Sequence, residues 1–107
     1  LTGSIDAVLR LPSGRFAIVD YKTNWLGAPA EPLTAAHYTP ARLATAMRGA
    51  HYPLQALLYG VALHRYLRWR LPGYEPRRHL GGVLYLFVRG MCGPDTPVVD
   101  GMPCGVF

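Results

Sequence analysis

Two strand-like runs around a short turn constrain the fold of this 107-residue chain more than any other feature. Residues 4–10 alternate well enough for a β-strand, and residues 15–21 return as a second strand. Between them, the Pro-Ser-Gly sequence at 12–14 has the chemistry of a tight turn. The sequence therefore predicts a β-hairpin. Asp6 and Asp20 interrupt or end the apolar runs, where a carboxylate needs a partner.

The rest of the chain predicts helices followed by one more strand. Residues 24–38 are rich in Gly and Pro and predict a loop. Thr39 then resembles an N-cap before a helix that ends near residue 48. A second helix is predicted over residues 53–70, and the apolar run at 82–88 predicts a strand covered on both faces.

The second predicted helix has an apolar stripe, which we expect to pack on the sheet. The stripe consists of Leu54, Leu57, Leu58 and Val61. The order strand, strand, helix, helix, strand predicts an α/β layer with mixed strand directions in a single domain over residues 1–107. Residues 91–107 form a Gly- and Pro-rich tail with little periodicity.

The charge balance favours an anionic partner. The formal net charge is +5, and ten of the eleven basic residues are arginine. A basic surface attracts nucleic acid first and anionic membrane second. No apolar run approaches the roughly 20 residues of a membrane span, and the N-terminus has no signal-peptide pattern. The chain does not begin with Met, so we expect a segment of a longer protein. Cys92 and Cys104 are expected to be free thiols in the reducing cytoplasm.

The candidate active site is Asp6, followed thirteen residues later by Asp20 and then by Lys22. Alternate residues of a strand share a face, so Asp20 and Lys22 project to the same side. Pairing of the hairpin about its turn brings Asp6 back near Asp20. Two carboxylates suit Mg²⁺ or Mn²⁺, and a bound metal activates water and stabilises phosphate charge. The ammonium of Lys22 can orient or deprotonate that water, or stabilise the developing charge.

Lys22 is the only lysine of the chain, in a protein that otherwise uses arginine. An ammonium can take part in proton transfer, whereas a guanidinium stays protonated. The alternative is that Asp20 and Lys22 form an ordinary edge-strand ion pair that contributes little. The upstream Asp6 makes the two interpretations about equally good.

Several motifs in order resemble the RecB-type nuclease modules of the PD-(D/E)XK superfamily. They are Gly3-Ser4-Ile5-Asp6, Asp20-Tyr21-Lys22-Thr23, Gln55 with Tyr59 four residues later, and the run at 81–90. The resemblance covers roughly residues 3 to 90 and is closest to RecB C-terminal nuclease domains, the exodeoxyribonuclease V type. It implies a restriction-endonuclease-like mixed sheet flanked by helices, and Mg²⁺-dependent cleavage of DNA, with Mn²⁺ as an alternative ion.

The resemblance also assigns roles to residues. Asp6 and Asp20 match the metal-binding aspartates, Lys22 the catalytic lysine, and the Tyr21 carbonyl a backbone metal ligand. Gln55 and Tyr59 match a motif that supports the site and DNA. The resemblance further implies a cytoplasmic helicase–nuclease that acts in recombinational double-strand-break repair with RecC-like and RecD-like subunits.

The sequence departs from that pattern at its start. The family has a helix before the first strand that supplies a histidine metal ligand, and the chain begins five residues before Asp6. We therefore expect a partial nuclease domain that lacks its N-terminal part. The alternative function is a truncated, inactive nuclease fold that binds DNA or docks a subunit.

A basic stretch follows at the end of the second predicted helix. Arg65 and Arg68 are candidates for contact with a DNA backbone, whereas the simpler interpretation is a solvated helix end whose cations suit the helix dipole. Trp25 and Trp69 can stack on bases, but packing in a core or interface is the favoured interpretation for both.

Overall fold

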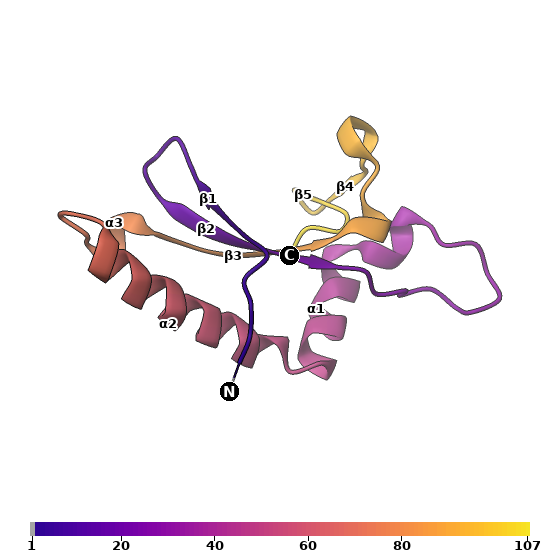
Figure 1. Ribbon diagram of the computed structural model, residues 1–107. Coiled ribbons are helices and arrows are strands. Elements are labelled where there is room, and N and C mark those ends of the chain that lie inside the picture. Colours follow the sequence, from indigo (N-terminus) through magenta and orange to yellow (C-terminus); the bar gives the residue numbers. More distant parts are fainter. Residues whose placement is uncertain (1) are drawn as a thin grey trace. The chain divides into compact units, whose positions relative to one another are not determined.

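The computed structural model describes residues 2–107 as two compact units (Figure 1). The first unit comprises Leu1–Asp20 and Pro53–Leu84, and the second comprises Tyr21–Tyr52 and Tyr85–Phe107. The chain passes between them within three elements: strand β2, the first turn of helix α2 and strand β3. No helix among the described residues is long and apolar enough to cross a membrane.

The elements follow the predicted order, with short additions near the C-terminus. They are β1 (Ala7–Arg10), β2 (Phe16–Lys22), α1 (Pro40–Gly49), α2 (Tyr52–Arg70), α3 (Pro76–His79), β3 (Leu80–Phe87), β4 (Val98–Val99) and β5 (Met102–Pro103). Both predicted long helices are present, and each differs from its expected bounds by one residue. The single-turn helix α3 was not expected, because four residues are too few to show helical periodicity.

Strands β1 and β2 form the predicted hairpin. They pair antiparallel from Ala7 opposite Val19 to Arg10 opposite Phe16. The turn closes with a 2.9 Å hydrogen bond from the Gly14 amide to the Leu11 carbonyl, and Gly14 has the positive φ that glycine tolerates best. Strand β1 begins at residue 7 rather than at 4. The reason is that the Ser4 carbonyl turns instead toward helix α2, where it accepts a 2.9 Å hydrogen bond from a tyrosine hydroxyl.

Strand β3 lies beside β2 and completes a three-stranded sheet in the order β1-β2-β3. Its first residues lie at the start of β2: a Cβ on Gly81 would come within 2.9 Å of the Phe16 carbonyl oxygen. The guanidinium of Arg15 donates to the Leu80 carbonyl at 2.8 Å, at the same end of the strands. Strands β2 and β3 therefore run parallel while β1 runs antiparallel, and the predicted mixed α/β fold is confirmed.

The face of α2 that packs on the sheet is not the predicted one. Leu63 and Leu67 are each 4% exposed and pack with Ile18 of β2. By contrast, Leu57 is 64% exposed, and the rest of the expected stripe is also exposed. The sequence of α2 contains two apolar stripes, and its periodicity alone does not say which faces the sheet. The predicted stripe was wrong because the packing of Leu63 and Leu67 sets the rotation of the helix.

The second unit has its own core around Tyr38 and Phe87, both fully buried, with Leu43 and Met47 of α1 buried as well. Residues 91–107 contain β4 and β5, which pair antiparallel. The Gly105 carbonyl accepts a 2.7 Å hydrogen bond from the Phe87 amide, which ties this segment to β3. Cys92 is exposed, Cys104 is buried and both are free, as predicted.

Candidate active site

The two aspartates of the candidate site lie on the hairpin of the first unit. Asp20 follows directly after the paired residue Val19 and is 4% exposed, an unusual degree of burial for a carboxylate. Asp6 directly precedes Ala7, the partner of Val19, and is exposed. One further step in the same register sets Asp6 opposite Asp20. The hairpin therefore brings the two carboxylates to neighbouring positions, as the sequence predicted.

Helix α2 supplies a polar partner for the buried aspartate. The Tyr59 hydroxyl oxygen lies 3.1 Å from Asp20 Oδ1 and 2.9 Å from the Ser4 carbonyl oxygen. A phenol has one proton, so the hydroxyl donates to one of these oxygens at a time or shares the proton between them. Gln55 Nε2 donates to the same hydroxyl at 3.1 Å, from one turn earlier in the helix. The four-residue spacing that identified this pair in the sequence sets both side chains on one helix face.

The electrostatics of Tyr59 report the acidic surroundings. Its pKa is raised above the usual value near 10, first by burial, then by the hydrogen bond to Asp20, and then by the negative charges of Asp20 and Asp6. All of these disfavour a phenolate. Tyr59 therefore stays a hydroxyl at neutral pH, where it can hold the carboxylate by donating its proton.

Lys22 and Tyr21 lie in the second unit, at the end of strand β2. The Lys22 Nζ is 4.0 Å from the centre of the Tyr52 ring and 5.4 Å from the centre of the Tyr85 ring. Both distances are within the range of a cation–π contact. The side chain of Tyr21 is 53% exposed, as the alternation of a strand between buried Asp20 and half-buried Lys22 requires.

Tyr52 and Tyr85 are the residues that sequence reasoning missed. Their rings stack with centroids 5.9 Å apart and planes inclined by 21°, and the Tyr85 hydroxyl donates to the Tyr52 carbonyl at 3.4 Å. Tyr85 is only 2% exposed, so its ring has little freedom to move. In the sequence Tyr85 looks like one more apolar residue of a strand and Tyr52 precedes a proline, so neither carries a local signal.

The other predicted residues lie away from this group. Arg65 and Arg68 are exposed on the last turns of α2, and Arg68 is nine residues beyond Tyr59, about 13 Å along a helix. Three histidines bond within their own unit: His64 with the Tyr74 hydroxyl at 2.8 Å, His37 with Thr34 and His79 with Glu75. Among residues 2–107, no group of three or more His, Cys, Asp or Glu is arranged to hold a metal ion.

Known proteins similar to this chain share one name. No family model matches the chain. Over all 107 residues it is 67% identical to the "RecBCD enzyme subunit RecB" of Mycolicibacterium smegmatis and 64% identical to that of Mycobacterium tuberculosis H37Rv. The protein of the same name in Escherichia coli K12 is 47% identical over 91 residues, or 85% of the chain. The chain spans 10%, 9% and 7% of the lengths of these three proteins.

The fold makes this chain a mixed α/β protein with two carboxylates at the end of a paired hairpin. Its sequence is that of a segment of RecB, so the predicted resemblance to RecB is confirmed. The wider assignment to the PD-(D/E)XK superfamily stays a prediction, as do the roles of the individual site residues.

Proposed function

We propose that this chain is the nuclease module of a RecB-like helicase–nuclease and hydrolyses DNA phosphodiester bonds with a divalent metal ion. The observation that carries the proposal is the hairpin register, which sets Asp6 opposite Asp20 and leaves Lys22 two residues further along β2. The identity to RecB subunits over the full chain supports the same conclusion. In this function the chain serves as part of an exodeoxyribonuclease V type enzyme.

The donor set fits Mg²⁺, with Mn²⁺ as the second choice. Carboxylate oxygens are hard ligands, and Mg²⁺ keeps several waters and binds proteins through one or two carboxylates together with phosphate oxygens. Asp6 and Asp20 would provide the carboxylates, and the Tyr21 carbonyl a further oxygen. When bound, the ion polarises the scissile phosphate and lowers the pKa of a water molecule. With only two carboxylates, substrate and water oxygens would complete the coordination.

The chain's own residues orient the reacting groups. Gln55 holds the Tyr59 hydroxyl, and that hydroxyl holds the buried Asp20 carboxylate at 3.1 Å. Asp20 therefore presents its carboxylate in a restricted orientation, which favours a defined metal geometry. Lys22 places a positive charge beyond Asp20 on the same strand, where it stabilises the extra negative charge that forms at the phosphate during attack.

The partners follow from the proposed function. The substrate is DNA, and a polypeptide of RecB length would work with RecC-like and RecD-like subunits in the repair of double-strand breaks by recombination. Arg65 and Arg68 would contribute non-specific contacts to the DNA backbone, since guanidinium groups bind phosphate without reading the sequence.

The test is the Mg²⁺-dependent degradation of linear DNA by the purified protein that carries this chain. The variants Asp20→Ala and Lys22→Ala should lose at least about 100-fold in rate, the usual scale for removing a charged group that acts on the transition state. Asp95→Asn removes an exposed carboxylate in the tail and is the matched control. Normal activity in both site variants would rule the proposal out.

One observation favours the alternative of an inactive nuclease fold that binds DNA or docks a subunit. Among the described residues there is no three-ligand cluster of the kind that holds a metal tightly. Calorimetric titration with Mn²⁺ separates the two functions. Binding that is lost in Asp20→Asn supports the nuclease, whereas salt-sensitive DNA affinity without any Mn²⁺ binding supports the inactive module.

A further inference from the structure

The C-terminal end of helix α2 exposes an aromatic side chain that the proposed nuclease site does not use. Trp69 is 75% exposed, and Tyr66 one turn earlier is 56% exposed. Their rings meet edge to face with centroids 6.2 Å apart. Exposed large aromatic side chains at this density mark surfaces that contact another molecule. The expectation that Trp69 packs in a core is therefore wrong.

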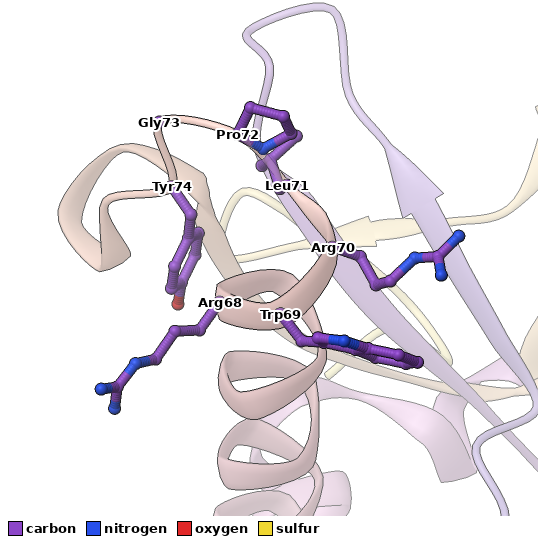
Figure 2. A pocket seen from close by; sticks show the side chains of 7 residues that line it. All are labelled: Arg68, Trp69, Arg70, Leu71, Pro72, Gly73 and Tyr74. Atoms are coloured by element: carbon purple, nitrogen blue, oxygen red, sulfur yellow. The ribbon is translucent and has the colours of Figure 1, made fainter.

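Arginine surrounds this aromatic pair. The Arg70 guanidinium carbon lies 5.0 Å from the centre of the Trp69 ring. Figure 2 shows Trp69 and Arg70 extending to one side of the helix end, and Arg68 and Tyr74 to the other. The segment 68–74 lines a hollow of about 400 Å³. The site thus combines a π-face, two guanidinium groups and an open concave surface.

Charge decides which kind of partner this surface suits. The sequence has no Asp or Glu between Glu31 and Glu75, and it places Arg65, Arg68 and Arg70 within six residues of α2. Cations at the end of a helix also suit its dipole. That explanation accounts for the arginines but not for an indole that is left in water beside them. An anionic ligand with flat apolar faces accounts for both.

We infer that the end of α2 is a binding surface for single-stranded nucleic acid, in which an unpaired base stacks on Trp69 and the arginines contact the adjoining phosphates. Arg70 covers part of the indole, and the 75% exposure of Trp69 leaves ring surface for a base. A duplex keeps its bases stacked on one another, so a stacking platform selects unpaired strands. Arg68 and Arg70 add sequence-independent, salt-sensitive affinity.

This surface goes beyond the proposed nuclease function and can be tested without cleavage. The purified protein that carries this chain is mixed, in EDTA, with an oligo(dT) strand that contains 5-iododeoxyuridine and is irradiated at long wavelength. Peptide mapping then locates the crosslink. A crosslink at Trp69 is expected, with loss of that crosslink in Trp69→Leu. Trp25→Phe is the matched control, because Trp25 also lies by an arginine but its Nε1 donates to the Ala28 carbonyl.

Affinity measurements separate stacking from charge. Trp69→Leu should weaken binding of oligo(dT) roughly 5- to 150-fold, the range found when one stacking side chain is removed. It should leave binding of an abasic strand of equal length unchanged. Arg68→Ala should weaken both strands and reduce the dependence of affinity on salt.

Three results would overturn the inference. In the first, the oligonucleotide crosslinks elsewhere and Trp69→Leu binds oligo(dT) normally. In the second, Trp69→Leu weakens the abasic strand as much as oligo(dT), which means that no base stacks on the indole. In the third, Trp69→Leu leaves DNA affinity intact and impairs assembly with a protein subunit, which would make this surface a protein interface. Because no metal is present, none of these results depends on whether the chain is a nuclease.

Discussion

The Tyr59 hydroxyl lies 3.1 Å from Asp20 Oδ1, although 39 residues separate the two in the chain. This contact joins helix α2 to the buried carboxylate of strand β2. It gives the Gln55 and Tyr59 pair a physical role: the helix restrains a carboxylate whose orientation the proposed metal site depends on.

Removal of that hydroxyl should affect both stability and activity. Tyr59→Phe keeps the ring but leaves Asp20 and Gln55 without a shared partner, so unfolding should cost about 0.5–1.5 kcal/mol less. DNA cleavage should slow, because the carboxylate is less restrained. Urea denaturation and a cleavage assay measure the two effects. Tyr66→Phe, at a tyrosine that is 56% exposed, is the control and should change neither. Equal stability of both variants would contradict the proposed restraint.

The raised pKa of Tyr59 predicts a loss of stability at alkaline pH. A group whose pKa is higher in the folded state than in the unfolded state stabilises the fold fully below its unfolded pKa. For tyrosine that value is about 10, and the stabilisation is lost as the pH rises through the folded pKa. The free energy of unfolding, followed from pH 8 to 11, should therefore decline less steeply in Tyr59→Phe. The pKa of Tyr74 is raised by burial, so Tyr74→Phe should remove a second part of the decline. Identical slopes in all three proteins would show that neither phenol is the cause.

The aromatic pair around Lys22 predicts a rate effect that rests on the proposed function. Tyr52→Leu removes the ring 4.0 Å from the Lys22 ammonium, whereas Tyr52→Phe keeps a ring there. A cation–π contact contributes about 0.5–2 kcal/mol, so kcat should fall roughly 2- to 30-fold in the leucine variant. The phenylalanine variant should retain most of the rate, and KM should change little in both. Equal loss in the two variants would mean that Tyr52 acts through its hydroxyl or through packing.

Two glycines of the first unit should respond in opposite directions to alanine. A Cβ at Gly81 would lie 2.9 Å from the Phe16 carbonyl oxygen, so Gly81→Ala should push β3 from β2 and destabilise the fold by about 1–3 kcal/mol. No atom lies within 4 Å of a Cβ at Gly60, inside α2. Gly60→Ala should therefore stabilise the helix by about 0.5–1 kcal/mol. Thermal or urea unfolding of the two variants checks both signs. A stable Gly81→Ala protein would show that the strands are not packed this closely.

The proposed function also predicts a response to charge-preserving substitution at Lys22. Lys22→Arg retains a positive charge but carries it on a larger planar group, which does not fit the space beside Tyr52 and Tyr85 in the same way. We expect it to restore less than a tenth of the activity lost in Lys22→Ala, measured as Mg²⁺-dependent DNA degradation. Full activity in Lys22→Arg would show that charge alone suffices.

The sequence by itself determined the features that depend on near neighbours in the chain. The Pro-Ser-Gly turn, the proline that opens α1 and the spacing of Asp6, Asp20 and Lys22 all appear as predicted, because turn chemistry and strand alternation act over a few residues. Only the tertiary structure decided which stripe of α2 faces the sheet, since Leu63 and Leu67 compete with an equally apolar stripe and packing settles the rotation. It also decided that Tyr52 and Tyr85, 33 residues apart, meet at Lys22. Such contacts depend on how distant elements pack, and no local pattern encodes them.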